Sequence, residues 1–217
     1  KDITYNYQNS DKLILDKANM IIPVGKSIGI VGASGSGKTT AVDILLGLLL
    51  ANEGEVLADG VNVMEHYSEW LSNIGYIPQS IFMLDDDIKS NVAFGVKKEE
   101  QDEERVWEAL REAQLEDFVR ELKDGIHTQI GERGMRLSGG QKQRIGIARA
   151  LYSNPAVLVF DEATSALDSE TEAAVMSSIN GLHGKKTMII IAHRLQTIKE
   201  CDMVYRVGDG KIVEENL

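Results

Sequence analysis

The sequence predicts an α/β fold built around a largely parallel sheet. Residues 27–31 form a short apolar stretch that is followed at once by glycines, and residues 39–50 then have the pattern of a buried helix. A second apolar stretch at 157–160 ends in an Asp-Glu pair, and a third at 187–192 follows a helix-like stretch over 169–182. Strands that alternate with helices in this way favour parallel pairing.

The rest of the chain is expected to flank and interrupt this sheet. A first strand is expected at 3–7, whereas residues 80–151 contain no convincing buried strand. Apolar side chains in that long stretch recur at the i, i+3, i+4 and i+7 spacing of one helix face, at Leu115, Phe118, Val119 and Leu122. We therefore expect one domain over 1–217, with a core from 1–79 and 152–217 and a helical subdomain from 80–151.

Composition narrows the class of protein before any motif is considered. The chain has 217 residues, with 23 Lys and Arg against 34 Asp and Glu, so its formal net charge is −11. This acidic balance argues against a general nucleic-acid binder, which needs an excess of Lys and Arg, but it leaves room for a local phosphate site. The longest apolar run, 44–51, is far shorter than the roughly 18 residues of a membrane span. The single cysteine, Cys201, leaves no internal disulfide and points to a reducing compartment.

The glycine-rich loop fits a phosphate-binding motif. Residues 32–39 read Gly-Ala-Ser-Gly-Ser-Gly-Lys-Thr and match G-x-x-x-x-G-K-[ST] at every fixed position. Glycines let the backbone curl so that its N–H groups point at phosphate oxygens, and the following helix presents its positive end to the same anion. Lys38 is expected to neutralise the β- and γ-phosphates, and the Thr39 hydroxyl to ligate Mg²⁺.

The acidic pair after the second strand suits the same chemistry. Asp161 ends an apolar strand, where Mg²⁺ bound to phosphate needs a second anchor. Glu162 comes one residue later and points elsewhere in an extended chain. It is therefore expected to orient and deprotonate a water that attacks the γ-phosphate.

A second glycine-lined helix start lies at 137–141, Leu-Ser-Gly-Gly-Gln, ahead of an amphipathic helix. It suits an anion but has no lysine and no Mg²⁺ ligand of its own. From the residues alone, two interpretations stay open: this segment completes the site of another chain, or it is a plain Ser-Gly-Gly helix cap.

Together these motifs resemble the nucleotide-binding domain of ATP-binding cassette (ABC) transporters, of the exporter type, over essentially the whole chain. Residues 32–39 match the Walker A loop of that family, 137–141 its signature, and 157–162 its Walker B strand with the following glutamate. The shorter matches are Gln79 in the Q-loop, residues 165–168 in the D-loop, His193 as the switch histidine, and Tyr7 as the aromatic residue that stacks on adenine. The resemblance implies a P-loop NTPase (RecA-like) core with an antiparallel β subdomain and an inserted α-helical subdomain.

The resemblance also implies a set of functional residues and two cofactors, ATP and Mg²⁺. The catalytic residues it implies are Glu162, His193, Gln79 and Lys38. The nucleotide-binding residues are Tyr7, Gly32, Ser34, Gly35, Ser36, Gly37, Lys38, Thr39, Thr40, Gln79, Ser138, Gly139, Gly140, Gln141, Asp168 and His193. The metal ligands are Thr39, Gln79 and Asp161. Tyr5 is a nearby rival to Tyr7 for the adenine contact.

The family relation further implies partners. Two such domains pair head to tail, so that Ser138 and Gly140 of one chain close on ATP held by the other, as a homodimer or heterodimer. The segments 79–95 and 128–134 resemble the places where exporters dock their membrane domain. We therefore expect a transmembrane domain, N-terminal on the same polypeptide, no nucleic-acid partner, and a location at the cytoplasmic face of the cell membrane.

Two other classes of function compete with this interpretation. A soluble ABC protein that acts on DNA, chromosomes or ribosomes shares most motifs, but chromosome-type relatives carry long coiled coils between the two Walker motifs, and no heptad run occurs here. Ribosome-type relatives carry two cassettes, and this sequence has one. A small-molecule phosphotransferase does not need a Leu-Ser-Gly-Gly-Gln segment. The transported substrate stays open: a lipid, lipid-linked sugar, peptide or drug is consistent.

Overall fold

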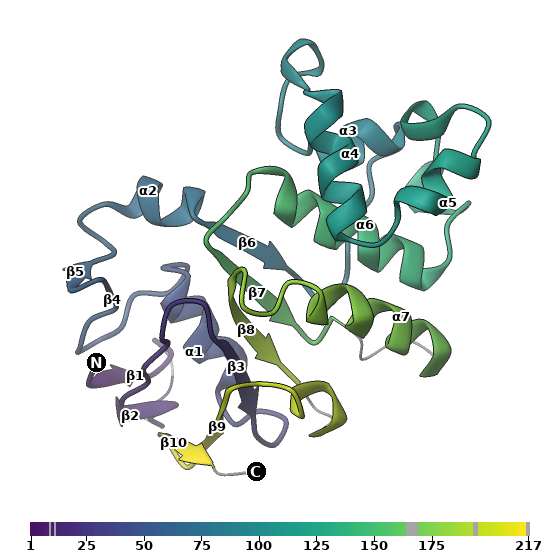
Figure 1. Ribbon diagram of the computed structural model, residues 1–217. Helices are drawn as coiled ribbons and strands as arrows, with labels where there is room; N and C mark the ends of the chain where they lie inside the picture. Colours follow the sequence, from purple (N-terminus) through teal and green to yellow (C-terminus); the bar gives the residue numbers. More distant parts are fainter. Residues whose placement is uncertain (9, 11, 164–168, 193–194, 216–217) are drawn as a thin grey trace.

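The computed structural model describes residues 1–8, 10, 12–163, 169–192 and 195–215. Its main sheet has the strand order β10-β9-β3-β8-β7-β6, in which β10 is antiparallel to β9 and the other described neighbours are parallel (Figure 1). The strands are β3 (Ser27–Val31), β6 (Ile74–Ile77), β7 (Val157–Asp161), β8 (Thr187–Ile191), β9 (Met203–Gly208) and β10 (Lys211–Glu215). The predicted α/β fold class is confirmed.

The sheet is covered on both faces, and successive residues of its central strands divide between two cores. Leu158 and Phe160 of β7 belong to the core on the side of the later helices. Val159, between them, packs instead with the core that contains α1 (Lys38–Leu45). Because side chains alternate across a strand, a strand buried on both faces has a continuous apolar sequence, which is why these strands were recognisable.

The first helix is shorter than the sequence predicted. The apolar pattern favoured a helix over 39–50, but α1 ends at Leu45. Gly47 has a φ of +75°, a left-handed conformation that ends helices, and the indole N–H of Trp70 donates to the Leu45 carbonyl at 3.0 Å. The apolar run extends beyond the end of the helix and includes Leu48, which is exposed. An apolar sequence here therefore does not mean that every residue is buried.

Two small antiparallel pairs flank the α1 side of the fold. The first joins β1 (Ile3–Tyr5) to β2 (Leu15–Ala18), and the second joins β4 (Leu57–Ala58) to β5 (Val61–Asn62). The strand expected at 3–7 thus ends at Tyr5, which leaves Tyr7 outside it. The remaining elements before the helical segment that follows Ile77 are α2 (Tyr67–Ser72) and β6, and β6 was not predicted.

Helices and turns occupy the long segment between β6 and β7, drawn in blue to green in Figure 1. They are α3 (Ile88–Val92), η1 (Lys98–Glu100), α4 (Glu103–Glu112), α5 (Glu116–Glu121), η2 (Gly125–His127), η3 (Glu132–Gly134) and α6 (Gly139–Tyr152), where η marks a 3₁₀ turn. After β7 come α7 (Ser169–Asn180) and η4 (Leu195–Ile198). The boundaries at 79/80 and 151/152 stay a prediction. In the part of the chain that the structure describes, no helix has the length and apolarity needed to cross a bilayer.

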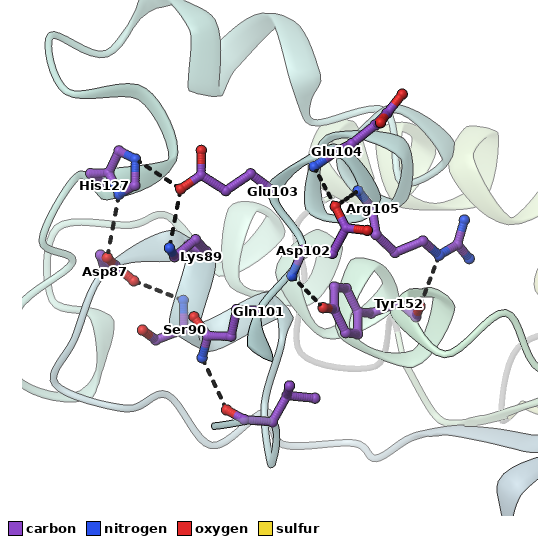
Figure 2. A network of polar contacts seen from close by, with 11 residues as sticks. Asp87, Lys89, Ser90, Gln101, Asp102, Glu103, Glu104, Arg105, His127 and Tyr152 are labelled. Atoms are coloured by element: carbon purple, nitrogen blue, oxygen red, sulfur yellow. Dashed lines mark hydrogen bonds and ion pairs between the residues drawn. The ribbon is translucent and has the colours of Figure 1, made fainter. Parts of the chain in front are cut away.

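A polar network ties the helical segments together (Figure 2). His127 lies between two carboxylates, 3.8 Å from Asp87 and 3.5 Å from Glu103. Asp102 caps α4, because its side chain accepts from the N–H groups of Glu104 and Arg105 at 2.9 and 3.2 Å. The segments 79–95 and 128–134, which the sequence singled out together, meet here at a β-bridge between Asp87 and Gln129.

Candidate nucleotide-binding site

The phosphate-binding motif forms the turn between β3 and α1. Gly32 has a φ of +155°, and a Cβ on it would overlap the Val207 carbonyl oxygen, so only glycine fits. The Lys38 side chain is buried and donates to the carbonyls of Gly32 and Ala33 at 2.9 and 3.1 Å. The loop is therefore wrapped around its own lysine.

Several donors of this turn suit an anion. The first N–H groups of a helix have no intrahelical acceptor, and Gly37, the N-cap of α1, supplies no side-chain cap. The buried Ser36 hydroxyl oxygen has no hydrogen-bond partner among the described residues. Donors that converge on one helix end fit a phosphate group, which carries several acceptor oxygens. The residues present therefore fit the triphosphate that the motif implies.

A cavity of 260 Å³ lies over this turn. Residues from three parts of the chain line it: Tyr7, Ile14, Ser34, Gly35, Gly37, Lys38, Thr39, Thr40 and Glu162. The fold thus brings together the predicted phosphate loop, the predicted aromatic residue and the predicted general base. Residues 138–141 are absent from this lining.

Tyr7, rather than Tyr5, is the aromatic residue available to a ligand. Tyr7 is 46% exposed and Tyr5 is 8% exposed. The two rings meet edge to face with centroids 5.2 Å apart. The Tyr7 hydroxyl is also within hydrogen-bond distance of the Thr40 hydroxyl, at 2.9 Å. The ring is therefore tied to the first turn of α1, next to the phosphate loop.

The two acidic side chains have different partners, but the chain at Glu162 is not extended as the sequence argument assumed. Glu162 has a φ of +50°, outside strand geometry, and its N–H donates to the Ile191 carbonyl at 3.1 Å. Its carboxylate accepts from the Gln79 side-chain amide at 3.0 Å. Asp161 instead accepts from the Tyr76 hydroxyl at 3.1 Å. The structure thus joins Gln79 to Glu162 and leaves Asp161 with a different neighbour.

Sequence reasoning missed two residues beside Asp161. Burial first, and then the charge of Asp161, raise the pKa of Tyr76 well above its ordinary range, so the phenol stays protonated. Burial, and then the charge of Asp161, also raise the pKa of Asp43 on α1. The helical spacing from Thr39 to Asp43 could have pointed to Asp43, because residues i and i+4 share one helix face.

The three metal ligands that the resemblance implies differ in their exposure to solvent. Thr39 and Gln79 are exposed, and Asp161 is half-buried. Within the described ranges, no group of three or more His, Cys, Asp or Glu side chains gathers to hold a metal ion. If Mg²⁺ binds here, phosphate oxygens would have to supply some of its ligands, as is usual for Mg²⁺ sites in nucleotide-binding proteins.

The signature segment begins α6 with a reciprocal cap. The Ser138 hydroxyl accepts from the Gln141 N–H at 3.2 Å, and the Gln141 side chain accepts from the Ser138 N–H at 2.8 Å. A Cβ on Gly140 would overlap the Thr171 side chain of α7. The helix-cap interpretation is therefore correct within one chain, whereas a role in another chain's site stays a prediction. Asp168 of the D-loop and His193 lie outside the described residues.

Comparisons with known proteins agree with these features. The model of the family described as ABC transporter matches residues 15–165. ATP-dependent lipid A-core flippases of Francisella novicida and Escherichia coli (strain K12) are similar to this chain at 43% and 40% identity, each over 99% of it. The chain spans 36% and 37% of the length of these relatives.

A solved structure, that of a bacterial Atm1-family ABC exporter with ATP bound, superposes with a TM-score of 0.85 at 36% identity. The match covers 98% of this chain and 37% of that one. Because the matching family model covers well over half of its residues, this chain belongs to the ABC transporter family.

Proposed function

We propose that this chain binds ATP with Mg²⁺ and hydrolyses it to ADP and phosphate, as the ATPase domain of an exporter. The cavity that the phosphate loop shares with Glu162 is the observation that carries the proposal. It places a helix N-terminus that can bind an anion next to a carboxylate that can act as a general base. Phosphoryl transfer to water requires both of these groups.

The roles of the residues follow from their positions. The loop N–H groups and Lys38 bind and orient the phosphates. Asp161 and Thr39, with Gln79, are the groups that would hold Mg²⁺, which supplies charge neutralisation at the phosphate oxygens when bound. Glu162 takes a proton from the attacking water, and Gln79, which donates to Glu162 at 3.0 Å, holds that carboxylate in line.

The proposal includes a second nucleotide-binding domain. Residues 138–141 do not line the cavity of their own chain, so a head-to-tail pair is the arrangement that gives them a nucleotide to contact. His193 and Asp168 are proposed to act in the same closed pair, by their match to the family motifs. ATP binding then closes the pair and hydrolysis reopens it.

We also propose a transmembrane partner, on the same polypeptide, and a location at the cytoplasmic face of the membrane. The relatives are named flippases and are nearly three times as long as the region they share with this chain. Their names favour a lipid among the substrates that the sequence left open. They also favour an exporter over the soluble alternative that acts on DNA or ribosomes.

The test is Glu162→Gln, which removes the base and keeps the size of the side chain. Hydrolysis is expected to fall by about 100-fold or more, while ATP is still bound and holds the two domains together as a stable pair. Glu104→Gln, the same change on the exposed face of α4, is the matched control. An unchanged hydrolysis rate in Glu162→Gln, with no ATP-dependent pairing, overturns the proposal.

A further inference from the structure

The hydroxyl of Tyr76 reaches the carboxylate proposed to hold Mg²⁺. Tyr76 lies on β6, in register with Val159 of the parallel strand β7. In-register residues of parallel strands share a face, and so do residues two apart, so Tyr76 and Asp161 lie on the same face of the sheet. The Tyr76 hydroxyl donates to Oδ2 of Asp161 at 3.1 Å.

Asp43 supplies a reason why such a donor is needed. Its helix, α1, covers the face of the sheet to which Val159 contributes. Asp43 on α1 and Asp161 at the end of β7 are therefore two carboxylates on the same side of the sheet. Like charges repel each other, and the Tyr76 hydroxyl that donates to Asp161 favours the charged form of this carboxylate.

The phenol is well suited to hold an oxygen atom in place. A tyrosine side chain has only two rotatable bonds, so little conformational freedom is lost when the Tyr76 hydroxyl is held in place. A phenol has an ordinary pKa of about 10, so its hydroxyl is a hydrogen-bond donor throughout the neutral range. Hydrogen bonds to a charged acceptor are stronger than those between neutral groups.

We propose that Tyr76 is a positioning residue for the metal site, one that orients Asp161 toward the cation held with the nucleotide. The inference rests on the proposed function, because it assigns Tyr76 to that same site. It predicts that the Tyr76 hydroxyl contributes to nucleotide affinity only when Mg²⁺ is present. The phosphate loop, which binds the nucleotide itself, does not depend on this hydroxyl.

The experiment compares wild type with Tyr76→Phe, which keeps the ring and deletes the hydroxyl. ADP affinity of the intact protein is measured by calorimetry with Mg²⁺ and again with the metal chelated. The gain in ADP affinity on adding Mg²⁺ is expected to be about fivefold smaller in Tyr76→Phe, since a hydrogen bond to a charged group is lost at a partly exposed site. ADP affinity without metal is expected to be unchanged.

The matched control is Tyr205→Phe. The Tyr205 hydroxyl donates to the Ile21 carbonyl at 3.1 Å, and Ile21 is not among the residues proposed to hold the nucleotide or Mg²⁺. Its loss is expected to lower the melting temperature slightly and to leave the gain from Mg²⁺ as in wild type. A merely structural role of Tyr76 would give the same pattern as this control.

The possible results distinguish a failure of the inference about Tyr76 from a failure of the proposed function. An equal gain from Mg²⁺ in wild type and Tyr76→Phe, or an equal loss of ADP affinity with and without metal, overturns the inference alone. If wild type fails to bind ADP under both conditions, the proposed function falls and the inference falls with it. A smaller gain confined to the metal-containing samples of Tyr76→Phe supports the assignment.

Discussion

At the scale of single residues, several charged side chains of this domain are held by specific hydrogen bonds. Lys38 is bound by two loop carbonyls, and Glu162 by the amide of Gln79. At the opposite end of β3, Asp202 accepts from both the N–H and the hydroxyl of Ser27, at 2.8 and 3.0 Å. These contacts fix where each charge lies.

Asp202 provides a pH-dependent prediction. The backbone N–H of Ser27 first, and then Lys26, lower the pKa of Asp202 to about 2. Because the folded pKa lies below the unfolded value of about 3.9, this carboxylate stabilises the fold fully above about pH 4 and loses its contribution as pH falls toward 2. Asp202→Asn should therefore lower the free energy of unfolding at pH 7, with a deficit that shrinks in acid.

Urea unfolding of wild type and Asp202→Asn between pH 7 and pH 3 measures this deficit. Asp209→Asn, a change of the same kind at an exposed turn residue, is the control. A deficit that stays constant across the whole pH range would be evidence against the ionic role of Asp202.

At the scale of elements, the predictable parts of the fold are those whose own sequence carries the signal. β3 and β8 are buried at every residue, and a continuous apolar stretch identified both. β10 was not recognised, because three of its five residues are exposed and its pairing with β9 is set by a turn. The end of α1 was placed too late, because Gly47, the residue with positive φ that ends the helix, was counted as part of the apolar run 44–51.

The residues of the candidate site also differ in whether the sequence alone could predict them. The phosphate loop is one contiguous segment, so its motif predicted Gly32, Lys38 and Thr39 directly. Tyr76 is 85 residues away from Asp161 in the sequence, and it reaches Asp161 only because β6 pairs with β7. A single sequence carries no signal for such a meeting, since it depends on tertiary packing.

Helix α4 gives a prediction at this scale. The Asp102 side chain caps its first turn with two hydrogen bonds (Figure 2). Asp102→Ala should lower the free energy of unfolding by about 1 kcal/mol, because the first N–H groups of the helix lose their acceptor. Thermal or urea unfolding measures the change.

Asp102→Asn is the matched control, since asparagine caps helices about as well as aspartate. It should lie close to wild type. Equal destabilisation by Asp102→Ala and Asp102→Asn would mean that the charge of Asp102, rather than its cap, stabilises this region.

At the scale of the whole molecule, the phosphate loop and residues 138–141 lie apart within one chain, and the proposed nucleotide site joins them only between two chains. The cavity holds the phosphate loop and Glu162, and residues 138–141 contribute nothing to its lining. Those residues begin α6, where they cap one another and pack against α7. The net charge of −11 is compatible with this arrangement, because the phosphate site relies on Lys38 and backbone N–H groups.

The measurement that tests this account most directly pairs two inactive variants of the intact protein. Lys38→Met disables the phosphate loop and Ser138→Arg disables the signature segment, so neither variant alone is expected to hydrolyse ATP. Coexpressed with different tags and purified as a mixed pair, they should regain hydrolysis, because one of the two sites then combines an intact loop with an intact signature. A mixed pair that hydrolyses ATP no faster than the separate variants would contradict the head-to-tail site.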